Sequence, residues 1–134
     1  MCINTSSNNN IHFFKPVGKS FFDVLSLFRG MNNEIQAQTM QLFVCVGMSN
    51  KEEIPMTTLA PRLGLSQASV SRNVSFFMKE NRYKEKGLGL LETREDPMER
   101  RKKLVKLTNK GKMFYDQIED ALKVSKSKSK ENRL

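Results

Sequence analysis

The chain has 134 residues, a net charge of +9 and two cysteines. This length suits one domain with a single core, and two cysteines are too few for a disulfide framework. No apolar run approaches the roughly 18 residues of a membrane span, and the polar N-terminus lacks a signal-peptide pattern. We therefore expect a soluble cytoplasmic protein with no membrane partner.

The positive charge is concentrated in the second half of the chain. Residues 1–78 hold 6 Lys and Arg against 4 Asp and Glu, whereas residues 79–134 hold 17 against 10. Cations gathered at one end of a chain attract polyanions, and nucleic acid is the most common of these. The alternative is a basic protein whose charge serves only solubility.

The first third of the chain predicts two helices. Residues 1–16 form an Asn- and Ser-rich leader that we expect to be disordered. A helix is predicted over residues 17–28, where apolar residues recur at helical spacing, and Gly30 is expected to stop it. A second helix is predicted over residues 34–48, whose dense apolar stripe indicates burial on more than one side.

The next segment predicts a helix-turn-helix. Residues 54–56 are expected to be extended because Ile54 precedes a proline. A short helix is predicted over residues 57–63, with Thr57 as its N-cap and Gly64 as its C-cap. A longer helix follows from Ser66 to about Lys79, with its inward stripe at Val70, Val74 and Phe77.

The last third predicts a β-hairpin and a final helix. Strands are predicted over residues 90–94 and 102–107, joined by a turn at Asp96-Pro97. Thr108 is expected to cap a helix that ends near Lys123, and residues 124–134 form a Ser/Lys tail that we expect to be disordered. The predicted fold is mainly α with a small β-hairpin wing (α+β), and residues 17–123 form the domain.

The helix from Ser66 has the face that a DNA groove requires. A helix entering the major groove buries one face in its domain and presents slim polar side chains on the other. The residues predicted to contact DNA are Ser66, Gln67, Ala68, Ser69, Ser71, Arg72 and Ser75. Phe76 does not suit DNA and is expected to pack on the wing or a neighbouring helix. The alternative is an ordinary amphipathic surface helix.

The hairpin carries the second set of candidate DNA-binding residues. Its cations are Arg94, Arg100, Arg101, Lys102 and Lys103, and its acids are Glu95, Asp96 and Glu99. The acids are expected to cap the turn or to hold an arginine in a defined pose for the minor groove. The alternative is a solvated charged hairpin with no partner.

These residues resemble the winged helix of the MarR (multiple antibiotic resistance regulator) family. The resemblance rests on LAPRLGLSQASVSRNV and on REDPMERRKKLVKLTNKG, and it covers about residues 57–123. It implies a cytoplasmic, dimeric transcription regulator. The helix from Ser66 would lie in the major groove, and an arginine of the Arg100/Arg101 pair would lie in the minor groove.

The family dimerises through long terminal helices, and its effector pocket lies beside them. Here the expected homodimer would use helices 17–28 and 108–123; the alternatives are another surface or no dimer. A small-molecule effector is doubtful because the last helix is short. With His12 as the single histidine and no glycine-rich phosphate loop, we expect no enzyme activity, no cofactor and no metal. Cys45 lies in an apolar helix and is interpreted as a buried thiol rather than a peroxide sensor.

The leading hypothesis is thus a sequence-specific regulator of MarR type that binds double-stranded DNA. The alternative is a small replication, packaging or architectural DNA-binding protein of a mobile element that uses the same module. A winged helix used only for protein contacts is a third possibility, which the basic wing disfavours.

Overall fold

A computed structural model of the protein describes residues 15–78 and 87–133, with side chains as far as Lys123. The elements follow in the order α1 (Pro16–Met31), α2 (Ala37–Gly47), β1 (Ile54–Pro55), α3 (Met56–Leu63), α4 (Gln67–Phe77), β2 (Leu91–Glu95), β3 (Lys103–Leu107) and α5 (Asn109–Arg133). Residues 1–14 of the predicted leader and residues 79–86, which link α4 to the hairpin, lie outside the described residues. None of the described helices is both long enough and apolar enough to cross a membrane.

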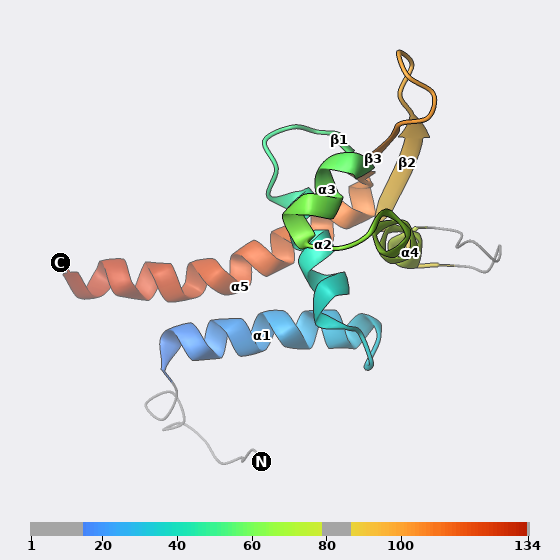
Figure 1. Ribbon diagram of the computed structural model, residues 1–134. Coiled ribbons are helices and arrows are strands. Elements are labelled where there is room, and N and C mark those ends of the chain that lie inside the picture. Colours follow the sequence, from blue (N-terminus) through green and yellow to red (C-terminus); the bar gives the residue numbers. More distant parts are fainter. Residues whose placement is uncertain (1–14, 79–86, 134) are drawn as a thin grey trace.

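Helices α1 and α5 pack along each other in opposite directions at one side of the molecule (Figure 1). Pro16 occupies the first turn of α1, where its missing N–H removes no helical hydrogen bond. Val24, Phe28 and Ile118 turn inward from this pair and are buried. The wing and α4 lie at the other side, away from the C-terminal end of α5.

A cluster of four phenylalanines joins the two sides. Phe28 of α1 meets Phe43 and Phe114 edge-on, with ring centroids 6.0 and 5.4 Å apart. Phe43 of α2 also contacts Phe77 at the end of α4, with a centroid distance of 5.3 Å. Such aromatic pairs bury large apolar area and favour tilted or edge-to-face geometry. The cluster therefore fixes α4 against the helices that carry it.

The three strands form one antiparallel sheet in the order β1-β3-β2. Strands β2 and β3 make the predicted hairpin, with Thr93 opposite Val105. The short extended piece predicted around Ile54 is confirmed as β1, and it pairs Ile54 with Val105 as a third strand. Val105 is fully buried, so the inner face of this sheet closes the core under α3 and α4.

Several predicted boundaries were wrong. Thr57 is not an N-cap, because Pro55 keeps the extended backbone of β1 and α3 begins at Met56. Gly30 does not stop α1, which continues to Met31. Helix α2 begins three residues later than predicted, because the Asn32 side chain accepts a hydrogen bond from the N–H of Glu34 at 2.8 Å and holds a turn there.

The final helix does not end near Lys123. Its backbone stays helical to Arg133, through the segment that was expected to be disordered. That segment contains no glycine or proline to stop a helix. The low-complexity pattern was therefore a poor guide to its backbone.

Candidate nucleic-acid interface

Helix α4 begins at a confirmed N-cap. The Ser66 hydroxyl accepts a hydrogen bond from the N–H of Ser69 at 3.1 Å, and Gly64 before it adopts the left-handed conformation (φ 68°) that ends α3. The turn between the two helices therefore follows from two local sequence signals. The predicted inward stripe of α4 is confirmed as well, because Val70, Val74 and Phe77 are fully buried.

The opposite face of α4 is polar and open. Ser66, Gln67, Ala68, Ser71 and Arg72 are exposed, whereas Ser69 and Ser75 are half-buried. In the free protein the Arg72 guanidinium donates to the Ser69 hydroxyl at 3.1 Å and so lies back along the helix. A single hydrogen bond between a charged and a neutral group contributes at most about 1.5–3 kcal/mol, and solvent exposure lowers this, so Arg72 can exchange Ser69 for another partner.

Phe76 was expected to pack on the wing or a neighbouring helix, and its ring contact is within α4. The ring is half-buried and packs edge-on against Phe77 of the same helix, at a centroid distance of 5.1 Å, at the edge of the core that also contains Leu91 of the wing. It thereby adds to the edge of the core and leaves the polar arc of α4 without a large apolar side chain.

Asn73 is the residue on α4 that sequence reasoning missed. It is buried, accepts a hydrogen bond from the Thr39 hydroxyl of α2 at 2.5 Å and donates one to the Ser69 carbonyl at 2.8 Å. Both groups are thereby satisfied, and α4 is tied to α2 by a directional contact. Its position between Val70 and Phe77 on the inward stripe was the available signal.

The base of the wing is bonded to both neighbouring helices. The Leu90 N–H donates to the Phe77 carbonyl at 2.7 Å, so the residue before β2 is hydrogen-bonded to the last residue of α4. The Thr108 hydroxyl donates to the Gly89 carbonyl at 2.6 Å and accepts from the Gly111 N–H at 3.0 Å. Thr108 is therefore confirmed as the cap of α5.

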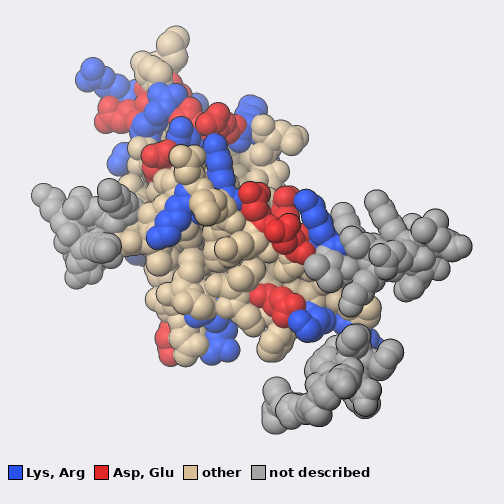
Figure 2. All heavy atoms as spheres, turned by 180° about the vertical axis from the view of Figure 1, so that it is seen from behind, with Lys and Arg blue, Asp and Glu red and all other residues tan. Residues whose placement is uncertain are grey.

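The turn of the wing is fixed by an acid, as expected. The Asp96 carboxylate accepts a hydrogen bond from the Met98 N–H at 2.8 Å. The backbone N–H of Asp96 donates to the Lys102 carbonyl at 2.9 Å. Arg100 and Arg101 are exposed within this turn, and in the described part of the chain their guanidiniums form no ion pair with an acid. Figure 2 shows the cations and acids of the wing interspersed on its surface.

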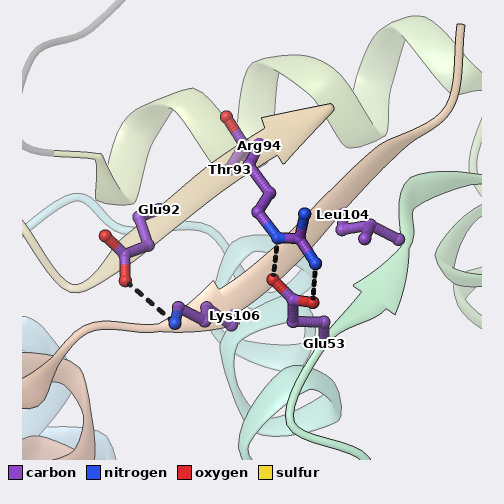
Figure 3. Close-up of a pocket in the computed structure, with 6 residues that line it drawn as sticks. All are labelled: Glu53, Glu92, Thr93, Arg94, Leu104 and Lys106. Carbon is purple, nitrogen blue, oxygen red and sulfur yellow. Dashed lines mark hydrogen bonds and ion pairs between the residues drawn. The ribbon is translucent and has the colours of Figure 1, made fainter. Parts of the chain in front are cut away.

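Arg94 has a different environment from the other wing cations. Its guanidinium makes two hydrogen bonds to Glu53, from Nε to Oε2 at 2.6 Å and from an Nη to Oε1 at 2.7 Å. Figure 3 shows the Arg94 side chain extending from β2 across β3 to reach it. The hydrogen bond from Arg94 lowers the pKa of Glu53, and Glu53 raises that of Arg94. Glu53 was not identified from sequence, and the contact spans 41 residues.

A second set of weaker ion pairs covers the same outer face of the sheet. Lys106 of β3 lies 3.8 Å from Glu52 and 3.7 Å from Glu92 of β2. These are long, solvent-exposed contacts of the kind that contributes little to stability. Together with the Glu53–Arg94 pair they give this face both signs of charge, rather than a continuous cationic surface.

The described residues show no cluster of three or more side chains that could bind a metal ion. Cys45 is buried in α2, as the sequence indicated. The remaining predicted DNA-binding residues, Lys102 and Lys103, lie at the end of the turn and the start of β3. The predicted DNA-binding residues thus form two groups, one on the exposed face of α4 and one on the wing. The hydrogen bond between Leu90 and Phe77 joins the wing to α4.

The chain matches no protein-family model and no curated protein sequence. Solved structures do match. RV1404 from Mycobacterium tuberculosis is 18% identical, with a TM-score of 0.61 over 98% of this chain and 84% of that one. The PcaV transcriptional regulator from Streptomyces coelicolor is 16% identical (TM-score 0.55; 90% and 79% covered). MarR itself is 12% identical (TM-score 0.55; 79% and 74% covered). At these identities the likeness concerns the fold: this chain has the winged helix-turn-helix fold that is found in MarR-type transcription regulators.

Proposed function

We propose that the protein is a sequence-specific regulator of transcription that binds double-stranded DNA as a homodimer. The observation that carries the proposal is the contrast between the two faces of α4. One face is fully buried, and the other presents a serine N-cap, small side chains and an arginine. A helix with this division can approach base edges closely without giving up its own packing.

In the proposed complex with DNA, α4 lies in the major groove. Gln67 and Arg72 are the side chains long enough to reach adenine or guanine edges, while Ala68 and Ser71 allow the helix close approach. Arg72 exchanges its contact with Ser69 for a base. The Asn73–Thr39 contact holds the helix at a fixed angle while it does so.

The wing supplies the second contact. Arg100 and Arg101 lie in a turn that Asp96 holds in place, so a guanidinium can enter the minor groove from a fixed base. Lys102 and Lys103 are suited to the flanking phosphates as point charges. Because Arg100 and Arg101 have no acidic partner among the described residues, binding breaks no ion pair there.

The homodimer is proposed on the exposed apolar side chains in the N-terminal half of α1. Val17, Phe21 and Phe22 are 75%, 60% and 64% exposed, and they lie on the helix that packs along α5. Three large apolar side chains on one helix are an unusual cluster for a monomer surface. Two copies joined there would present two α4 helices to half-sites about one helical turn apart.

Paired substitutions test the division of labour between α4 and the wing. Arg72→Ala should cost about 1–3 kcal/mol on a selected duplex and relax its sequence preference, because a base contact is lost. Lys103→Ala should weaken selected and random duplexes alike and reduce the salt dependence by about one unit. Anisotropy titrations of both duplexes measure this. Equal effects of Arg72→Ala on the two duplexes would refute base reading by α4.

A further inference from the structure

We propose that Glu53, through its two-point contact with Arg94, is a positioning residue that sets the direction of the wing relative to the recognition helix. Arg94 then serves the wing from within the protein instead of contacting DNA. The inference rests on the proposed DNA-binding function and adds a specificity-determining residue to it.

The pair joins two parts that must keep a fixed relation. Glu53 directly precedes β1, and β1 leads without a loop into α3, the first helix of the helix-turn-helix. Arg94 is the fourth residue of the five in β2, just before the turn of the wing. Strand β1 itself contributes only two paired residues to β3. The Glu53–Arg94 contact adds a direct side-chain link between this edge and β2.

The geometry of the Glu53–Arg94 contact is suited to orienting the wing rather than to raising the free energy of unfolding. Two parallel hydrogen bonds of 2.6 and 2.7 Å fix the planes of both the guanidinium and the carboxylate. Half of the Arg94 side chain and a quarter of the Glu53 side chain remain exposed, so screening keeps the contribution to folding small. A lysine in place of Arg94 would keep the positive charge but could not form two parallel hydrogen bonds to Glu53.

The charges support the same division of roles. Arg94 is the wing cation whose charge is already matched by an acid, whereas Arg100 and Arg101 have no such partner in the described part of the chain. Arg94 keeps N–H groups that do not bond Glu53, but its charge is already matched by that carboxylate. A phosphate therefore gains more from the unmatched charges of Arg100 and Arg101 than from Arg94.

The test compares binding to a selected duplex and to a random duplex over a range of salt concentrations, with the full chain. For Glu53→Gln, Arg94→Gln and Arg94→Lys, the ratio of the two affinities should fall by about three- to tenfold. The double variant Glu53→Gln/Arg94→Gln should fall no further than either single variant. The salt slope should stay at the wild-type value in Arg94→Gln, because no phosphate contact is lost.

Glu52→Gln is the matched control. It removes the same charge from the neighbouring residue, whose contact to Lys106 is a long 3.8 Å, and it should leave the ratio unchanged. Thermal melts of every variant check that the fold is retained. The inference is overturned if either Arg94→Lys or Glu53→Gln keeps the wild-type ratio of affinities. It is also overturned if the effects of Glu53→Gln and Arg94→Gln add in the double variant, or if Arg94→Gln lowers the salt slope by about one unit. If the wild type prefers no duplex at all, the proposed function itself fails.

Discussion

At the residue scale, Gly111 shows why one position of the wing pattern must be glycine. It lies in the first turn of α5 and donates its N–H to Thr108. A Cβ at Gly111 would overlap the carbonyl oxygen of Leu90, and backbone there cannot move aside cheaply because Leu90 also accepts from the Thr108 N–H at 3.1 Å. The glycine is thus required by close approach of α5 to the start of the wing.

Gly111→Ala should therefore destabilise the protein by about 1–3 kcal/mol, as overpacking does. Gly18→Ala is the control, because a Cβ at Gly18 in α1 would meet no described atom within 4 Å. That substitution should be neutral or slightly stabilising, since alanine favours a helix. Urea unfolding curves of the two variants measure the difference. Equal stability of the two would remove the packing explanation.

At the element scale, the signals that predicted correctly are local. The Gly64 turn and the Ser66 cap act within three residues, and the stripe from Val70 to Phe77 repeats within one helix. The pairing of β1 with β3 and the Glu53–Arg94 contact join residues about 40–50 positions apart. Such contacts depend on the tertiary arrangement, so neither spacing nor propensity could reveal them.

The link between β1 and β2 also predicts a pH dependence. The pKa of Glu53 is lowered by its hydrogen bond from Arg94, so the charged form is favoured in the folded state. The resulting stability is present above the ordinary pKa of 4.5 and is lost as the pH falls through the lowered value. The midpoint of thermal unfolding of the wild type should exceed that of Glu53→Gln near neutral pH.

This difference should shrink and vanish under acidic conditions below the lowered pKa of Glu53. The Glu52→Gln variant should show a smaller difference near neutral pH, because Glu52 is 67% exposed and makes only the long contact to Lys106. Melting curves across the acidic range check the sign. A difference between wild type and Glu53→Gln that grows on acidification would contradict the assignment of the ion pair.

At the scale of the whole molecule, the four phenylalanines connect the wing side to the α1–α5 pair, so an interface on α1 would position α4 rigidly. If α1 is that interface, Phe21→Glu or Phe22→Glu should weaken dimerisation by about ten- to hundredfold, because each buries a large ring. Met98→Glu, at a side chain that is 91% exposed on the wing turn, should leave the dimer intact. Light scattering at micromolar concentration measures the mass, and a monomeric wild type would exclude this interface.

The central claim is that α4 and the wing together read double-stranded DNA. Its most direct test is selection of binding sites from a random duplex pool by the full chain at low salt, followed by titration of the enriched sequence. We expect enrichment of a two-fold symmetric site with half-sites about one helical turn apart, bound at least about a thousandfold more tightly than random duplex. Failure to bind any duplex at low salt, or binding without enrichment of a sequence, would contradict it.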